Sequence, residues 1–156
     1  LKEDLNDIYS CEGYRLPTEA EWEFAARAGT TGDLDADGSA FPMSNQCLST
    51  QLTTGGLLDD YAWFCGNTQQ PQAAASLLPN SNELYDLYGN ILEWCHDGYA
   101  SFPSSEIDPV GTGSYMILRG GSWSHSPSQI NHSDRYFLPP DTRQDNTGVR
   151  FARSLD

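Results

Sequence analysis

Positively charged residues are scarce in this sequence. Lys and Arg together number 8, against 22 Asp and Glu among 156 residues, which gives a net charge of −14 at pH 7. A nucleic-acid partner is therefore not expected, because binding to nucleic acid needs a basic surface that neutralises phosphates. Apolar runs are short as well: none approaches the roughly 20 residues that a helix needs to cross a bilayer, so we expect no membrane insertion.

Hydrophobic residues make up only 38% of the chain, yet aromatic residues reach 12%. Disordered chains are poor in aromatic residues, so this composition indicates a folded domain. The 14 Gly and 9 Pro residues predict many turns and loops. The length fits one domain, since domains cluster near about 100–150 residues.

The cysteines, Cys11, Cys47, Cys65 and Cys95, form no C-x-x-C pair, which argues against a zinc knuckle or a thioredoxin motif. An even number of cysteines in an acidic, loop-rich chain favours two disulfides and an oxidising compartment. We therefore favour an extracytoplasmic or secreted protein. Of the possible pairings we favour Cys47–Cys65, which closes the polar loop between them, and Cys11–Cys95 then follows by elimination. Free buried thiols are the alternative.

One helix is clearly predicted, and it starts at Thr18. Glu21 lies three residues later, which makes a capping box, and acidic residues in the first turn favour the helix dipole. Trp22 and Ala26 then fall on one face at helical spacing, and Gly29 supplies a stop signal. The pattern predicts a helix of about three turns.

Elsewhere the sequence favours short strands between long loops. Residues 61–65 read as a short strand or a buried extended segment, residues 115–119 as a strand, and residues 147–153 as an edge strand with alternating apolar and Arg side chains. One helix, a few short strands and much irregular structure predict an α+β domain.

An acidic loop offers a weak calcium motif. Asp33, Asp35 and Asp37, followed by Gly38, match the first half of an EF-hand loop. The match then fails, because Ser44 stands where a bidentate Glu is required. The two interpretations are a weak second calcium site and a solvated acidic loop.

Several motifs occur together in a characteristic order: residues 15–27 (RLPTEAEWEFAAR), 84–94 (LYDLYGNILEW), 119–123 (RGGSW), Arg135, Pro140, Arg143 and 148–150 (GVR). With these motifs, residues 11–153 resemble the formylglycine-generating-enzyme (sulfatase-modifying-factor) domain family. That family also includes the second domain of ergothioneine-type synthases and lectin-like proteins diversified by retroelements.

The resemblance implies an α+β, C-type-lectin-like fold with few short strands and helices, stabilised by calcium. We expect residues 1–156 to form a single domain of this family. Family members usually begin with a further segment ahead of the motif at residues 15–27. Two alternatives stay open: a minimal domain, or a piece of a longer protein.

The resemblance also maps calcium ligands onto the carboxylates of Asp86 and Glu93 and the carbonyls of Gly89 and Ile91. Calcium prefers such hard oxygen ligands. A bound cation would also account for two carboxylates among Leu, Tyr and Trp residues, where unpaired charges are costly. In the alternative interpretation, Asp86 caps a turn and Glu93 pairs with an Arg.

The copper chemistry of the catalytic family members is not expected here. In those enzymes two cysteines after the Gly-Gly-Ser motif bind copper(I), which needs soft thiolate ligands. Alignment places His125 and Ile130 at these positions, and no cysteine follows Cys95. The resemblance therefore argues against formylglycine generation by the family mechanism.

The segment 122–136 has the polar and aromatic composition of binding loops. In the retroelement-diversified relatives, this region carries the ligand-contacting residues; a plain polar surface loop is the alternative. The candidate ligand-binding residues are Trp123, His125, Gln129, Asn131, His132 and Tyr136. The arginines that follow the calcium motif are expected to fix loops rather than to bind anions: Arg119, Arg135, Arg143 and Arg150.

The leading hypothesis is a non-catalytic, calcium-stabilised, lectin-like module that binds an unidentified protein or glycan. The alternative is a metal-dependent oxidative enzyme of the same superfamily, with His125 and His132 as candidate iron ligands. A structural subunit of a larger assembly is the third interpretation.

Overall fold

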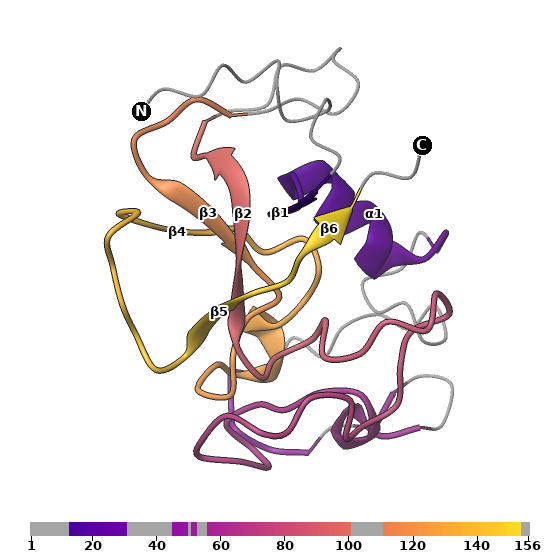
Figure 1. The fold of residues 1–156 in the computed structure, drawn as a ribbon. Coiled ribbons are helices and arrows are strands. Elements are labelled where there is room, and N and C mark those ends of the chain that lie inside the picture. The colour runs from indigo at the N-terminus through magenta and orange to yellow at the C-terminus, as the bar shows by residue number, and fades with distance from the viewer. Residues whose placement is uncertain (1–12, 31–44, 50, 53–55, 101–110, 154–156) are drawn as a thin grey trace.

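In the described part of the chain, short strands and one α-helix make up the fold (Figure 1). The computed structural model describes residues 13–30, 45–49, 51–52, 56–100 and 111–153. The elements in chain order are β1 (Tyr14–Arg15), α1 (Glu19–Arg27), η2 (Leu58–Asp60), β2 (Leu92–Gly98), β3 (Met116–Arg119), η3 (Pro127–Gln129), β4 (Tyr136–Leu138), β5 (Thr147–Val149) and β6 (Ala152–Arg153). This arrangement confirms the predicted α+β class. Within the described ranges, no helix is long and apolar enough to span a bilayer.

A four-stranded sheet in the order β4-β3-β2-β5 forms the centre of the molecule. β3 runs antiparallel to β2 and β4, whereas β5 runs parallel to β2. β1 and β6 pair separately as a two-stranded antiparallel ribbon. The predicted strand 147–153 is therefore wrong as a single element, because its two halves, β5 and β6, belong to different sheets. For residues 61–65 the sequence left a strand and a buried extended segment open. The structure shows the extended segment, which a single bridge joins from Trp63 to Gly89.

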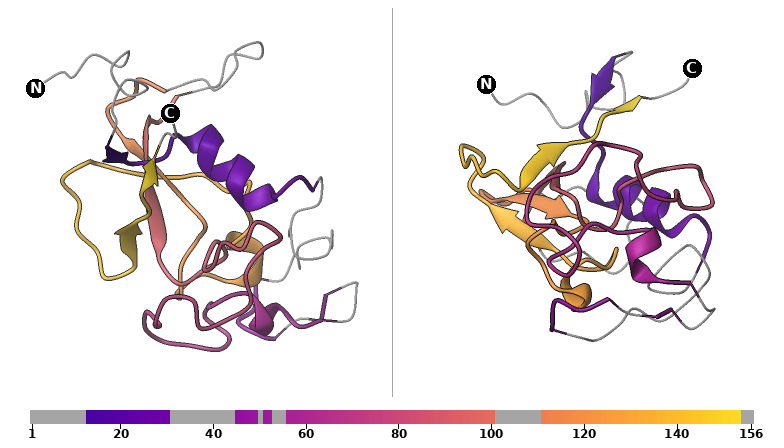
Figure 2. Two further views of the ribbon diagram at one scale, coloured as in Figure 1. Left: turned by 45° about the vertical axis from the view of Figure 1, so that its right-hand side comes forward. Right: turned by 90° about the horizontal axis from the view of Figure 1, so that it is seen from below.

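The central sheet has one face toward α1 and one face away from it (Figures 1 and 2). Side chains alternate along strands, so the pairing of Glu93 with Arg119 and of Leu118 with both Trp94 and Tyr136 assigns each residue to a face. The inner face carries Glu93, Cys95, Ile117 and Arg119. The outer face carries Leu92, Trp94, Met116, Leu118, Tyr136, Leu138 and Val149. The outer face is thus apolar too, which is unusual for a sheet with one helix layer.

Helix α1 forms as its sequence predicts. The Thr18 hydroxyl accepts from the Glu21 N–H at 3.1 Å, and the Glu21 carboxylate accepts from the Thr18 N–H at 2.9 Å, which completes the capping box. Trp22 and Ala26 are buried against the sheet. The chain leaves the helix at Ala28, whose φ of 44° is left-handed, one residue before the predicted stop at Gly29.

A disulfide joins Cys47 to Cys65, one of the two bridges favoured from the sequence. Cys95 instead is a free thiol in the hydrophobic core, and burial raises its pKa. The favoured Cys11–Cys95 bridge is therefore corrected: Cys95 points to the inner face of β2, where Ile117 and Trp22 surround it in the same cluster. Cys11 itself, and the candidate weak calcium ligands Asp33, Asp35 and Asp37, lie outside the described residues.

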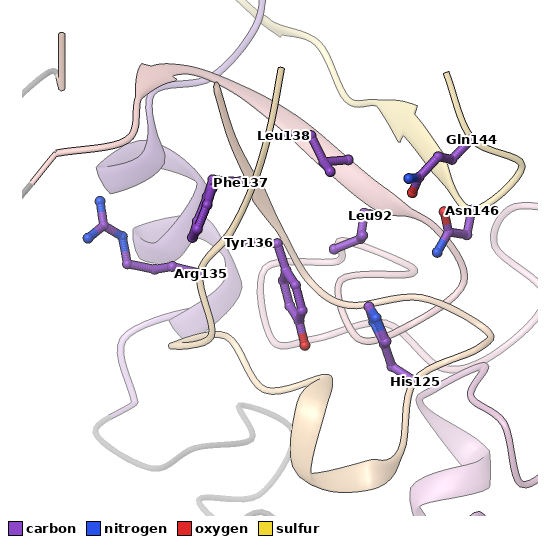
Figure 3. A pocket seen from close by; sticks show the side chains of 8 residues that line it. All are labelled: Leu92, His125, Arg135, Tyr136, Phe137, Leu138, Gln144 and Asn146. Carbon is purple, nitrogen blue, oxygen red and sulfur yellow. The ribbon is translucent and has the colours of Figure 1, made fainter. Parts of the chain in front are cut away.

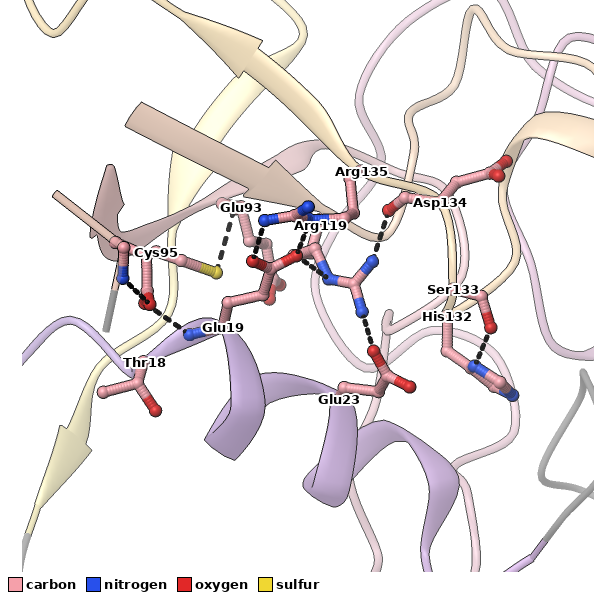
Figure 4. Close-up of polar contacts among 12 residues, drawn as sticks. Thr18, Glu19, Glu23, Glu93, Cys95, Arg119, His132, Ser133, Asp134 and Arg135 are labelled. Carbon is pink, nitrogen blue, oxygen red and sulfur yellow. Dashed lines mark hydrogen bonds and ion pairs between the residues drawn. The ribbon is translucent and has the colours of Figure 1, made fainter. Parts of the chain in front are cut away.

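The buried guanidinium of Arg119 ties the sheet to α1 (Figure 4). Arg119 is 0% exposed and lies 5.4 Å from the Trp22 ring centroid. Its Nη2 pairs with the Glu23 carboxylate, and its Nη1 donates to the Asp134 carbonyl at 2.6 Å. Its Nε lies 3.5 Å from Oε1 of Glu19. The arginine therefore joins β3, the helix and the loop before β4.

Replacing Arg119 should destabilise the protein much more than replacing a surface arginine. Arg119→Met removes the buried cation that faces Glu19 and Glu23, so that Glu19 keeps only Arg135 as a partner. We expect a loss of about 3–5 kcal/mol in the free energy of unfolding. Arg27→Met is the matched control: Arg27 also pairs with Glu23, at 2.8 Å, but on the surface, where such pairs contribute about 1 kcal/mol or less. Urea unfolding measures both. Equal losses would contradict the role given to Arg119.

Candidate functional site

A pocket of about 270 Å³ opens on the outer face of the central sheet (Figure 3). Leu92, Tyr136 and Leu138 belong to this face by strand register, and they form its apolar side. Residues from the loops on either side of β4 complete it. The described residues that line the pocket are Leu92, His125, Arg135, Tyr136, Phe137, Leu138, Gln144 and Asn146.

The His125 ring stacks on the Tyr136 ring at one side of the pocket. Their centroids are 4.8 Å apart and the planes differ by 11°. The Tyr136 hydroxyl donates to the Gln129 carbonyl at 2.7 Å, and burial raises its pKa, so the hydroxyl keeps its proton. This bond fixes the tyrosine side chain against the loop that contains η3.

The hydrogen bonds of His125 determine which ring nitrogen carries the proton. Its Nδ1 accepts the backbone N–H of Ser122 at 3.1 Å. A backbone N–H can only donate, so Nδ1 is unprotonated and the proton of the neutral ring lies on Nε2. Burial lowers the pKa of His125, with the Asp134 charge acting in the opposite direction. Nε2–H makes no hydrogen bond with any residue in the described part of the chain.

Two carboxamides, those of Gln144 and Asn146, also line the pocket. Asn146 Nδ2 donates to the hydroxyls of Ser122 and Ser124, at 3.3 and 3.4 Å. Its Oδ1 is buried and accepts no hydrogen bond from the described residues. Gln144 lies next to it and is exposed. An unpaired buried acceptor is uncommon in folded proteins and indicates a position where a ligand or water donates.

The arginine in the pocket wall is already paired. Arg135 Nε and Nη2 donate to the two carboxylate oxygens of Glu19, at 2.6 and 2.8 Å, and Nη2 also donates to the Ala100 carbonyl. Its guanidinium lies 5.2 Å from the Tyr99 ring centroid. The charge of Arg135 is therefore compensated within the protein, as the sequence analysis expected for these arginines. The pocket presents no net charge from it.

The structure brings only part of the predicted ligand-binding set to the pocket. His125 and Tyr136 line it. His132 was predicted to contact a ligand, but it is 0% exposed, and its Nδ1 lies 3.0 Å from the Ser133 hydroxyl. The buried side chain therefore does not take part in a binding surface. It is buried because the turn around Asn131 folds it inward: the Asn131 Oδ1 accepts the backbone N–H groups of Ser133 and Asp134.

Two further candidates, Gln129 and Trp123, do not line the pocket. Gln129 Oε1 accepts the N–H and the hydroxyl of Ser126. Trp123 is partly buried, and its indole N–H has no acceptor among the described residues. The sequence analysis missed Leu92, Gln144 and Asn146, since each belongs to another segment and only the packing of the strands brings them together.

The segment expected to bind calcium is held by hydrogen bonds from the protein. Glu93 is buried, and its carboxylate accepts from Arg150 Nε and Nη2, at 2.9 and 2.7 Å, and from Trp22 Nε1 at 2.6 Å. Asp86 Oδ2 accepts the Ala75 N–H at 2.7 Å. These contacts match the alternative in which Asp86 caps a turn and Glu93 pairs with an arginine.

The donor chemistry still fits a calcium ion in part. Asp86 Oδ1 accepts no hydrogen bond from the residues that the structure describes, so it is available as a ligand. Gly89 and Ile91 lie in the same turn; Gly89 has a left-handed φ of 78°, and a Cβ there would lie 1.9 Å from the Trp63 carbonyl oxygen. Glu93 would have to share its carboxylate with Arg150. A calcium ion at this turn would therefore depend mainly on Asp86 and the carbonyls of Gly89 and Ile91.

The two positions at which the resemblance places copper-binding thiols have separate roles here. Ile130 is 0% exposed and packs in the hydrophobic core, whereas His125 lines the pocket. Gly121 permits this packing: its φ is 73°, and a Cβ would lie 2.6 Å from Ile130 Cγ2. Across the described ranges, no three His, Cys, Asp or Glu side chains form a group that could hold a metal ion. His125 and His132 do not form such a group either.

The tautomer of His125 can be tested directly. We expect long-range ¹H–¹⁵N NMR spectra to show an unprotonated Nδ1 and a protonated Nε2, with a titration midpoint below about 6.5. Because the folded pKa is lowered, the stability that the neutral ring contributes is present above about pH 6.5 and is lost as the pH falls. A proton on Nδ1, or a midpoint above 6.5, would contradict the geometry.

Two curated proteins are similar in sequence to this chain. The chain is 34% identical over 166 residues to the formylglycine-generating enzyme of Streptomyces coelicolor, covering 92% of this chain and 48% of the enzyme. It is 35% identical over 161 residues to the mouse protein named inactive C-alpha-formylglycine-generating enzyme 2, covering 97% of this chain and 46% of that protein. The chain thus spans about half the length of these curated relatives.

A solved structure shares the fold. Treponema denticola variable protein 1 superposes with a TM-score of 0.75 at 32% identity, covering 91% of this chain and 48% of that one. Residues 3–155 match the family described as sulfatase-modifying factor enzyme 1-like domain. These matches confirm the resemblance that the ordered motifs indicated. The chain belongs to the sulfatase-modifying factor enzyme 1-like domain family.

Proposed function

We propose that this chain is a non-catalytic recognition module that binds a ligand, a protein or a glycan, in the pocket on the outer face of its sheet. One observation carries the proposal: the two expected thiol positions hold His125, which lines the pocket, and Ile130, which packs in the core. A soft-metal site cannot be rebuilt from a buried isoleucine and a histidine that already accepts a backbone N–H.

The composition of the pocket supports binding rather than reaction chemistry. Apolar side chains from β2 and β4 form one side, and a few polar groups also line the pocket, the usual layout of a small-ligand site. The charge of Arg135 is compensated by Glu19. A relative in the same family carries the word inactive in its name, which is consistent with a non-catalytic role.

The setting of the module is also a proposal. The Cys47–Cys65 disulfide favours an oxidising, extracytoplasmic compartment. The relatives are about twice as long as this chain, which favours a module within a larger chain or assembly. The net charge of −14 argues against a nucleic-acid partner, because phosphates would be repelled.

An assay for formylglycine tests the non-catalytic role. The protein, loaded with copper(I), is incubated with a cysteine-containing peptide and oxygen, and mass spectrometry follows the loss of the thiol. We expect no conversion, because Cys65, whose N–H bonds to the His125 carbonyl, is held in the disulfide with Cys47, and the free thiol of Cys95 is buried in the core. The Streptomyces enzyme serves as the positive control. Conversion above the rate without protein would overturn the proposal.

Calcium is proposed as a stabilising ion at the turn of Asp86, Gly89, Ile91 and Glu93. We expect calcium to raise the melting temperature of the wild-type protein and not that of Asp86→Asn. This variant retains an oxygen for the Ala75 N–H but removes the charge that a hard cation needs. Asp141→Asn, at an exposed site, is the control. Equal melting with calcium and with a chelator in the wild type would exclude the site.

A further inference from the structure

We propose that the pocket binds the acetamido group of a neutral N-acetylated sugar. This inference rests on the proposed recognition function and names the class of ligand for it. The argument uses the two unpaired polar atoms of the pocket, its apolar side, its charge and the strand edge beside it.

One donor and one acceptor in the pocket make no hydrogen bond to a described residue and lie close to the apolar side. Nε2–H of His125 donates to no described residue, because Nδ1 is the nitrogen that bonds to Ser122. Oδ1 of Asn146 is buried and accepts from no described residue. A secondary amide supplies the complement of both, a carbonyl oxygen for the histidine and an N–H for the asparagine. Leaving a buried acceptor unpaired costs about 1–3 kcal/mol, so a donor here has a clear energetic benefit.

The rest of the pocket suits the remainder of such a ligand. Leu92 is 4% exposed and, with Leu138, gives an apolar surface that can pack against a methyl group. The exposed carboxamide of Gln144 stands at the rim, where it can bond to hydroxyls (Figure 3). The volume of about 270 Å³ admits one sugar ring rather than a long chain.

The charges of the side chains in the pocket favour a neutral ligand over an ionic one. Arg135 is paired with Glu19, and burial lowers the pKa of His125 so that its ring is neutral at pH 7. Among the residues that the structure describes, no carboxylate lines the pocket. A neutral ligand therefore avoids the cost of burying an unpaired charge.

The strand edge disfavours an extended peptide. A peptide would add to an exposed edge through backbone hydrogen bonds, and β4, one of the two edge strands of the sheet, lines the pocket. β4 has only three residues, and Pro139 and Pro140 follow directly. Proline has no N–H to donate, so strand addition stops here.

The experiment compares N-acetylglucosamine with glucose, which lacks the acetamido group. Titration of the ¹⁵N-labelled protein by NMR should show saturable shifts at the side-chain amide of Asn146 and at His125. We expect N-acetylglucosamine to bind at least about ten-fold more tightly than glucose, the effect of one or two hydrogen bonds. Equal affinities, or no binding of either sugar, would overturn the proposal.

A variant and a matched control locate the binding. Asn146→Leu removes the acceptor and should weaken N-acetylglucosamine about ten-fold, while Asn82→Leu, at an exposed asparagine on another surface, should leave the affinity unchanged. The comparison of the two sugars on the wild-type protein decides the question even if Asn146→Leu fails to fold. Equal weakening by both variants would contradict the assignment.

A third titration separates a sugar from a peptide source of the amide. N-acetylalanine methylamide, which carries secondary amides without a sugar ring, should bind more weakly than N-acetylglucosamine. Tighter binding would contradict a sugar and identify a peptide as the class of ligand. Failure of this inference leaves the proposed function intact if the formylglycine assay is negative. Conversion in that assay would remove the proposed function itself.

Discussion

The guanidinium of Arg119 is buried without contact to solvent, and the position of the pocket depends on how that charge is paired. It joins β3 to Glu23 and Glu19 on α1 and to the Asp134 carbonyl. Glu19 in turn binds Arg135, the residue directly before β4 (Figure 4). Because buried charges are tolerated only when they are paired, this chain of contacts sets the distance between helix, sheet and edge strand. The strand that carries Tyr136 is thereby held in place from the opposite face of the sheet.

The loop between β3 and β4 is fixed in a second way, by apolar packing. Ile130 lies in the core next to Gly121, where any Cβ would collide with it. Ser122 is buried as well; its N–H bonds to His125, and its hydroxyl accepts from Asn146. A region that the family resemblance associates with two metal-binding thiols is here anchored by a hydrocarbon side chain. Its neighbour His125 lines the pocket, which supports the proposed binding function.

Local signals allowed correct predictions where a structure depends on near neighbours in the chain. The capping box of Thr18 and Glu21 predicted the start of α1, since both hydrogen bonds lie within three residues. Residues 147–153 were predicted as one strand, but Arg150 turns the chain there, because its guanidinium binds Glu93 and the Tyr85 carbonyl. Those partners are 57 and 65 residues away. His132 was misplaced for a similar reason: its burial follows from a turn closed by the Asn131 side chain.

The sequence by itself determined the α+β class, the single helix, the family and the loss of both thiols, because ordered motifs and residue identities carry these directly. Only the tertiary structure decided which polar residues meet. Leu92, Tyr136 and Asn146 come from three segments and meet through the pairing of β2 with β5 and of β3 with β4. The tertiary structure also assigned Arg150 to Glu93 and left Cys95 in the core. Side-chain pairing over such separations depends on the packing of the whole sheet, which no local pattern specifies.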